Sequence, residues 1–173
     1  MNITRRAAAS GDEPWLRDIH HAAYRDLIVR QLGAWDQLRA DRHFEETWAA
    51  GQVEVLLLDG EPCGYSVIRL NGTDIEVDEL VVEPGHQGRG IGTRVLLDTM
   101  ELAGSAGVGV TLRTAQLNRA AGLCRRLGFS EVGRTETHIL FEWRVDAPTR
   151  VTPRARPSHE GERDLLDRPL ASL

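Results

Sequence analysis

A glycine-rich segment between a predicted strand and a predicted helix limits the possible folds of this chain more than any other feature. Alternating apolar residues over 75–82 predict the strand, and apolar residues at three- and four-residue steps over 93–103 predict the helix. The segment between them, EPGHQGRGIG, has glycine at positions 88, 90 and 92. Glycine lets backbone N–H groups approach a ligand without an intervening Cβ atom, and a helix start adds unpaired amides and the positive end of the helix dipole. The segment predicts an anion site suited to a pyrophosphate, although a tight strand-to-helix turn would use glycine in the same way.

The spacing of the glycines excludes two familiar phosphate-binding loops. The pattern GxxxxGK[ST] of nucleotide hydrolases does not occur, and the dinucleotide fingerprint GxGxxG would need glycine where Thr93 stands. What remains is Gln87-x-x-Gly90-x-Gly92, placed between a strand and a helix.

The rest of the chain up to position 145 alternates between helical and β-type patterns. The predicted elements are a helix over about 12–30, a second helix containing Leu38, Phe44 and Trp48 and stopped by Gly51, a strand with Val53, Val55 and Leu57, a strand over 63–70, the strand over 75–82, the helix over 93–103 closed by Gly104, a strand over 108–112, a short helix capped by Asn118 and ending at Leu127 before a left-handed Gly128, and β-type sequence at Val132 and over 139–145. The order is ααββ, then βαβα, then ββ.

Length and composition indicate one domain followed by a different kind of segment. The chain has 173 residues, of which 41% are hydrophobic and 27% charged, and residues 1–145 read as a single domain with an ordinary soluble composition. Residues 146–173 hold most of the prolines, interleaved with Arg, Glu, Asp and Ser. We expect this Pro- and Arg-rich tail to be flexible, or to fold over a partner subunit.

Charge and cysteine usage exclude several classes of partner. A net charge of -5 argues against a nucleic-acid binder, which usually has a basic face. No apolar run reaches the roughly 20 residues of a membrane span, and the first residues lack the apolar core of a secretory signal, so we expect a cytoplasmic protein with no membrane partner. Cys63 and Cys124 lie far apart without CxxC spacing, so we expect neither a metal site nor a disulfide framework.

Two motifs in the same order resemble the GNAT superfamily of acyl-coenzyme A dependent N-acyltransferases. Gln87, Gly90 and Gly92 match that family's [Arg/Gln]-x-x-Gly-x-[Gly/Ala] signature at the strand-to-helix junction, and NRAAGLCRRLGF over 118–129 is similar, with one residue fewer, to its N-x-x-A-x-x-L-Y-x-x-x-G-F block. The resemblance covers about residues 75–133 well, residues 2–74 weakly and the tail not at all. It implies an α/β (α+β) fold with a mixed central sheet of about six to seven strands, a splayed central strand pair and about four flanking helices.

The resemblance also implies a site for acetyl-coenzyme A as co-substrate. By resemblance, Leu80, Val81 and Val82 line the pantetheine arm, Gln87, Gly88, Arg89, Gly90, Ile91, Gly92 and Thr93 hold the pyrophosphate, and Asn118 and Leu123 touch the pantetheine. Each assignment has a plainer alternative: Asn118 would also serve as a helix cap, Leu80 and Val82 as core residues, and Arg89 as a solvated loop charge.

Acyl transfer to an amine sets a requirement for a base. A primary aliphatic amine has a pKa near 10.4, so freeing its lone pair at pH 7 costs roughly 4 to 5 kcal/mol. The neutral amine would then attack the thioester carbonyl directly, with the oxyanion stabilised by a strand N–H and no covalent enzyme intermediate.

Three side chains are candidates for the proton transfers. Glu79 lies on the strand that leads into the glycine segment and is our first choice of base, although an ion-paired carboxylate would look the same. His138 lies on a predicted C-terminal strand and has an ordinary pKa suited to proton uptake, although a single histidine on a strand is more often structural. Cys124 stands where the family block usually has the tyrosine that protonates the leaving thiolate, which puts its role as acid in doubt.

The acceptor is predicted only as a primary amine of a small molecule or peptide. The N-terminal helices and the last strands are expected to form its side of the site, a region that contains His20, His21, Tyr24, Arg25, Trp35 and Trp48. A non-catalytic acyl-coenzyme A binding module with a regulatory role is the alternative function. The resemblance also makes a homodimer possible.

Overall fold

The structure is a computed structural model that describes residues 2–145. Its α-helices are α1 (Glu13–Leu32), α2 (Gln37–Ala50), α3 (Ile91–Ala106) and α4 (Ala120–Arg126), and its 3-10 turns are η1 (Ser10–Asp12) and η2 (Pro84–His86). Its strands are β1 (Ile3–Ala7), β2 (Val53–Leu58), β3 (Glu61–Asn71), β4 (Asp74–Val82), β5 (Gly109–Ala115), β6 (Ser130–Arg134) and β7 (His138–Trp143). The tail predicted over 146–173 lies outside the described residues.

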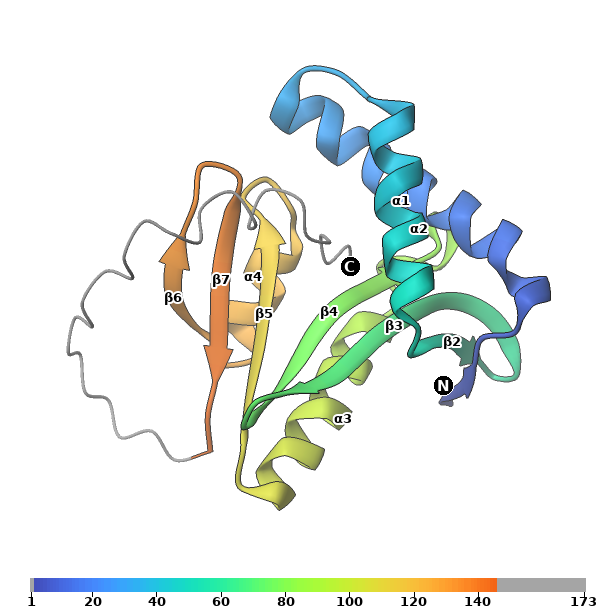
Figure 1. The fold of residues 1–173 in the computed structure, drawn as a ribbon. Helices are drawn as coiled ribbons and strands as arrows, with labels where there is room; N and C mark the ends of the chain where they lie inside the picture. Colours follow the sequence, from blue (N-terminus) through green and yellow to red (C-terminus); the bar gives the residue numbers. More distant parts are fainter. Residues whose placement is uncertain (1, 146–173) are drawn as a thin grey trace.

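The strands form one mixed sheet with the helices packed around it. Their order is β1-β2-β3-β4-β5-β7-β6 (Figure 1). Among the described strands, β4 and β5 are parallel, and all other neighbours pair antiparallel. The predicted α/β fold, with a mixed sheet of six to seven strands and about four helices, is therefore confirmed.

The parallel pair at the centre of the sheet separates along its length. β4 and β5 pair only over Asp74–Val77 and Gly109–Leu112, although both strands continue beyond these residues. Figure 1 shows the two strands together at one end and apart at the other. The predicted splay is confirmed, and it opens toward the residues that lead from β4 into the glycine segment.

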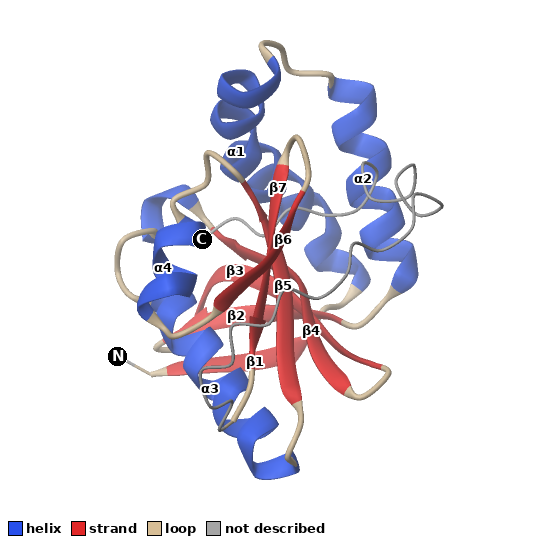
Figure 2. Cartoon of the chain, turned by 90° about the vertical axis from the view of Figure 1, so that its left-hand side faces the viewer, coloured by secondary structure: helices blue, strands red, loops and turns tan. Residues whose placement is uncertain are grey.

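Each face of the sheet has its own hydrophobic core. One core joins α3 and α4 to the sheet through residues such as Val95, Leu96 and Leu80. The other joins α1 and α2 to the sheet through residues such as Leu16 and Phe44. In Figure 2, α1 and α2 lie together at the top of the view while α3 and α4 lie to the left of the sheet. The gap at the splay thus lies between two faces that different helices cover.

The N-terminal helices follow the predicted periodicity. Buried residues recur along α1, which ends at Gly33 with φ 86°. Asp36 caps α2 by accepting a hydrogen bond from the Arg39 N–H at 3.0 Å, and Gly51 follows its last residue as predicted. None of the helices within residues 2–145 has the length and apolar character needed to cross a bilayer.

Strand β1 is absent from the elements that the sequence pattern predicts. Among the described strands it pairs only with β2, at the edge of the sheet, and its sequence ITRRA is largely exposed. Edge strands often carry charged side chains, which discourage pairing with another chain. Because β1 lacks the alternation of apolar residues that usually indicates a strand, the sequence pattern did not predict it.

The predicted end of α3 at Gly104 is wrong. The helix starts at Ile91 and continues to Ala106, and Gly107 ends it with φ 68°. Gly104 lies inside the helix, where a Cβ atom would come within 3.2 Å of the Val145 side chain. Gly104 therefore allows close packing against the chain after β7, and Gly107 ends the helix.

Candidate active site

The glycine segment turns from β4 into α3 with a backbone that needs glycine at two positions. Gly88 has φ 75° and Gly90 has φ 81°, both in the left-handed region that residues with a Cβ atom rarely adopt. Gly90 is the N-cap residue of α3, so the helix begins directly after it. Because the first amides of a helix have no partner inside the helix, this turn presents N–H groups together with the positive end of α3.

The side chain of Gln87 fixes the start of this turn. Its Nε2 donates a hydrogen bond to the Val82 carbonyl at 2.9 Å, and its Oε1 accepts one from Arg119 at the start of α4. Gln87 therefore ties the turn to the end of β4 and to the neighbouring helix. In this structure its side chain positions the backbone.

A cavity of about 430 Å³, which we call the loop cavity, lies beside the turn. It is lined by Val82, His86, Gln87, Gly88, Gly90, Ile91, Gly92, Thr93, Arg119, Ala120, Leu123 and Arg126. Most of the predicted coenzyme-binding residues are among them. The guanidinium groups of Arg119 and Arg126 add positive charge that the glycine pattern did not predict. Backbone amides, a helix N-terminus and two arginines form a donor set that fits a diphosphate.

Four predicted coenzyme-binding residues lie outside this lining. Leu80 and Val81 have no exposed surface and pack into opposite cores of the sheet. Arg89 is exposed. Asn118 Oδ1 accepts a hydrogen bond from the Ala120 N–H at 2.9 Å, although the N-cap residue of α4 is Arg119. Their contacts with a coenzyme stay predictions.

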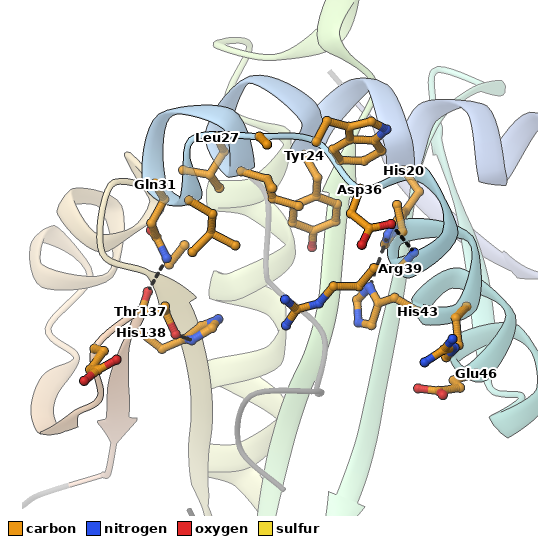
Figure 3. Close-up of a pocket in the computed structure, with 18 residues that line it drawn as sticks. His20, Tyr24, Leu27, Gln31, Asp36, Arg39, His43, Glu46, Thr137 and His138 are labelled. Atoms are coloured by element: carbon orange, nitrogen blue, oxygen red, sulfur yellow. Dashed lines mark hydrogen bonds between the residues drawn. The ribbon is translucent and has the colours of Figure 1, made fainter. Parts of the chain in front are cut away.

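A second cavity, of about 540 Å³, lies on the other face of the sheet, and we call it the helix cavity (Figure 3). It is lined by His20, Tyr24, Leu27, Ile28, Gln31, Leu32, Ala34, Trp35, Asp36, Arg39, Ala40, Arg42, His43, Glu46, Ala115, Glu136, Thr137 and His138. Figure 3 shows Tyr24 of α1, His43 of α2 and His138 of β7 projecting toward the same space. Of the residues expected on the acceptor side, His21, Arg25 and Trp48 do not line it.

Glu79 lies beneath the wall of the helix cavity. Its side chain has no exposed surface. Its Oε2 accepts a hydrogen bond from the Tyr24 hydroxyl at 2.6 Å, and its Oε1 lies 3.9 Å from His43 Nε2. Tyr24 and His43 both line the cavity, whereas Glu79 does not. The two cavity-lining side chains therefore stand between the buried carboxyl group and any acceptor.

A chain of buried polar side chains continues from His43. Its Nδ1 lies 3.3 Å from His20 Nε2, and His20 Nδ1 lies 2.6 Å from the Tyr65 hydroxyl. His20 is 2% exposed and Tyr65 is fully buried. Buried polar groups lower stability unless they are hydrogen-bonded, so the close contacts along this chain satisfy groups that water cannot reach.

Burial dominates the proton affinities in this network. It raises the pKa of the Glu79 carboxyl well above the ordinary value, while the hydrogen bond from Tyr24 opposes the rise. Burial also lowers the pKa of His20, with the neighbouring His43 and His21 acting in the same direction. At neutral pH, His20 is therefore an uncharged ring that can accept one hydrogen bond and donate another.

His138 reaches the helix cavity from the first position of β7. It is 7% exposed, and its Nδ1 lies 2.7 Å from the Thr137 hydroxyl oxygen. Burial lowers the pKa of His138 to about 4, with a contribution from the positive charge of Arg113. His138 is therefore in the cavity where the acceptor was expected, and it is uncharged at neutral pH.

Cys124 lies in the core between α4 and the sheet and lines neither cavity. Its side chain has no exposed surface, and burial raises the pKa of the thiol to about 12. The structure thus places this residue among apolar neighbours. Its role as an acid stays a prediction from the resemblance alone.

The sequence prediction did not identify His43 and Tyr65, and did not connect His20 and Tyr24 with Glu79. A signal was present in α1, where His20 and Tyr24 fall on the stripe that contains Leu16 and Leu27. Polar residues on a buried helix face need partners, so this stripe pointed to a polar network. The position of the partners could not be deduced from α1 alone.

The mixed sheet with its splayed central pair, and the loop cavity beside it, agree with the fold and site that the resemblance to GNAT acyltransferases implies. The family model of the acetyltransferase (GNAT) family matches residues 15–129. Because this match covers more than half of the chain, the protein belongs to the GNAT acetyltransferase family.

Solved structures show the same fold at low sequence identity. The PaiA N-acetyltransferase of Thermoplasma acidophilum, solved in complex with coenzyme A, is similar with a TM-score of 0.64 and 13% identity over 84% of this chain and 100% of that one. An acetyltransferase of Thermus thermophilus gives a TM-score of 0.63 and 21% identity over 84% of this chain and 98% of that one. The ribosomal-protein-S18-alanine N-acetyltransferase of Escherichia coli gives a TM-score of 0.58 and 18% identity over 87% of this chain and 99% of that one.

A sequence relative is an uncharacterized protein of Mycobacterium leprae. It is 35% identical over 74 residues, which is 40% of this chain and 20% of that protein. The match thus spans about a fifth of the relative's length.

Proposed function

We propose that this chain is an N-acyltransferase that moves the acetyl group of acetyl-coenzyme A to a primary amine by direct attack, with both substrates bound together. The observation that carries the proposal is the position of the two cavities. The loop cavity lies at the N-termini of α3 and α4, and the helix cavity lies under α1 and α2 on the other face. The splay between β4 and β5 opens between the two faces and gives two substrates a place to meet.

The loop cavity is suited to the diphosphate of the coenzyme. The amides after Gly88 and Gly90 and the guanidinium groups of Arg119 and Arg126 would bind its oxygens. Acetyl-coenzyme A supplies the activated thioester carbonyl. The unpaired edge of β4 in the splay would offer a backbone N–H to the developing oxyanion.

Glu79 is the better candidate for the base, and His138 the weaker one. The pKa of His138 is lowered to about 4, so its ring holds a proton poorly at neutral pH, and this disfavours His138 as the base. The pKa of Glu79 is shifted in the opposite direction by burial, so its carboxylate takes up a proton more readily than an ordinary one. Removing a proton from the acceptor is therefore assigned to Glu79.

The leaving thiolate places no demand on Cys124. A thiol of ordinary pKa near 8.5 leaves as a reasonably stable thiolate at neutral pH, so catalysis does not depend on a strong acid. We expect Cys124→Ala to retain turnover within about tenfold, because the effect of the substitution is confined to core packing. A loss of several hundredfold, with folding intact, would restore the acid role.

The helix cavity favours an amine with an apolar body. Its walls include Leu27, Ile28 and Trp35, and its volume is about 540 Å³, within the range of small-ligand sites. Charged groups of both signs, such as Asp36 and Arg39, lie among the lining residues and would contact a more polar end. The acceptor would be a small molecule or the end of a peptide.

The test is a thiol-release assay with acetyl-coenzyme A over a panel of aryl-alkyl amines, amino acids, polyamines and peptides. Calorimetry measures coenzyme binding in parallel. Release of thiol with an amine, and acetylation of that amine by mass spectrometry, is the expected result. Coenzyme binding without turnover on any acceptor would instead support the non-catalytic binding module, and absence of binding would overturn both.

A further inference from the structure

The buried position of Glu79 leaves a gap in the path of the proton. Glu79 has no exposed surface and does not line the helix cavity. An acceptor in that cavity therefore cannot contact the carboxyl group directly. The cavity-lining side chains that approach its two oxygens are Tyr24, at 2.6 Å from Oε2, and His43, at 3.9 Å from Oε1. The proton must pass one of them.

The hydrogen-bond chain behind His43 disfavours the histidine as the carrier. Tyr65 is fully buried, and its hydroxyl contacts His20 Nδ1 at 2.6 Å. An unsatisfied buried O–H donor costs more than an unused acceptor lone pair, so Tyr65 donates to His20 Nδ1. His20 Nε2 then carries a hydrogen and donates to His43 Nδ1, at 3.3 Å.

This donor order sets the state of the His43 ring. With Nδ1 accepting from His20, the neutral ring of His43 carries its hydrogen on Nε2, the atom that faces Glu79 Oε1. Both ring nitrogens are thus oriented along the buried chain, and no nitrogen lone pair remains for an acceptor in the cavity. His43 therefore contributes a positive N–H dipole toward the carboxylate.

Tyr24 has the geometry that His43 lacks. Its hydroxyl donates to Glu79 Oε2, and its oxygen keeps lone pairs that can accept a proton while the original one departs. The ring packs in the same core as Val81 of β4 and Ala115 of β5, on the two strands that separate at the splay. The hydroxyl group therefore lies near the place where the thioester and the amine would meet.

We infer that Tyr24 relays the acceptor's proton to Glu79, a step that rests on the proposed function. One N–H bond of the ammonium group breaks and its proton joins the Tyr24 oxygen, while the Tyr24 hydroxyl proton moves to Glu79 Oε2. The electron pair left on nitrogen is the nucleophile. Tyr24 ends as a neutral hydroxyl, and the charges of ammonium and carboxylate cancel as amine and carboxylic acid.

Several other charged groups set how readily Glu79 accepts that proton. Besides burial and Tyr24, the pKa of Glu79 is raised by the negative charge of Asp78 and lowered by the positive charges of Arg113 and Arg69. His43 faces the other carboxylate oxygen from α2. We expect activity to fall as pH drops through the pKa of Glu79, because the protonated carboxyl group cannot accept from Tyr24.

The decisive experiment compares Tyr24→Phe, Glu79→Gln and the double variant, using an amine that the wild type turns over. Each single variant should lose about 100-fold in kcat/KM, the usual scale of an acid–base contribution. Because the two groups act in series, the double variant should lose no more than the less active single variant. Coenzyme binding by calorimetry should be unchanged in all three, which controls for folding.

A matched control is available on α2. Thr47 is 4% exposed, and its hydroxyl makes no hydrogen bond within the described residues. Thr47→Val removes a buried hydroxyl without changing side-chain shape and should keep wild-type kcat/KM. A plot of the wild-type rate against the deuterium fraction of the solvent should be curved, as expected when two protons move together. The same plot for Tyr24→Phe should be linear.

A second readout needs no turnover. Infrared titration of the coenzyme-free protein follows the carboxylic acid band of Glu79, whose pKa should rise in Tyr24→Phe because the carboxylate loses its donor. An unchanged titration, or a Tyr24→Phe variant within threefold of wild-type activity, would overturn the relay alone. A wild type that turns over no amine would overturn the proposed function and the relay together.

Discussion

Replacing His138 tests whether this buried ring is held uncharged, as its surroundings dictate. Burial and the charge of Arg113 lower the pKa of His138 from 6.5 to about 4. The unfolded chain therefore binds a proton at a higher pH than the folded one does. The resulting stability is complete above pH 6.5 and is lost as pH falls toward 4.

The size of this effect follows from the two pKa values. At pH 5 the ring is almost fully protonated in the unfolded chain and mostly neutral in the folded one. This difference lowers the free energy of unfolding of the wild type by about 2 kcal/mol relative to pH 7. Partial screening of the ring by solvent would reduce the loss to about 1 kcal/mol. His138→Asn removes the titrating group while an amide can still contact Thr137. The free energy of unfolding should therefore fall less for the variant than for the wild type between pH 7 and pH 5.

Urea unfolding at the two pH values, followed by tryptophan fluorescence, measures the difference. Other buried groups also titrate: the lowered pKa of His20 acts in the same direction as that of His138, and the raised pKa of Glu79 acts in the opposite one. Comparing variant with wild type at each pH cancels both contributions. If the two proteins lose the same free energy between pH 7 and pH 5, His138 is not held neutral by burial, and the argument against His138 as base disappears.

Three further substitutions probe the turn, the pairing of β3 with β4, and the polar chain. Gly90→Ala places a Cβ atom at φ 81°, a strain of about 1–2 kcal/mol. If the turn shifts to relieve this strain, its amides move, and calorimetry should show coenzyme A binding weakened by about 5- to 30-fold. Gly64→Ala brings a Cβ atom into the carbonyl oxygen of Val81, so the free energy of unfolding in urea should fall by about 1–3 kcal/mol. Tyr65→Phe removes the donor that begins the buried chain, and nitrogen NMR should show His43 changing from one tautomer to a mixture, whereas an unchanged spectrum would contradict the donor order.

The turn beside the loop cavity could be predicted because its determinants are local in sequence. The strand, the turn and the helix start lie within residues 75–103, and the turn depends on glycine at positions where φ is positive. Local rules for strands, helices and glycine apply directly to such a segment. Arg119 and Arg126 were missed because they reach the loop cavity from another helix, through tertiary packing.

The polar network beside the helix cavity could not be predicted in the same way, because its contacts join distant segments. Tyr24 and Glu79 are 55 positions apart, and His20 and Tyr65 are 45 apart. No local pattern states which buried polar side chain will meet which. The sequence indicated Glu79 and some residues of α1 separately, and only the packing of α1 and α2 on the sheet brings them into one network.

A change of phase within β4 explains why Glu79 faces the helices at all. Ile75 and Val77 pack toward α3, and Leu80 packs on that same side three residues later, where a regular strand would turn it away. The ladder with β3 passes from Val77 to Glu79 between adjacent residues of β3, which makes Asp78 the extra residue of a β-bulge. Without the bulge, Glu79 would point into the apolar core under α3. Bulges often re-aim a side chain beside an active site, and in the sequence the two successive acidic residues interrupt the alternation that Ile75 and Val77 begin.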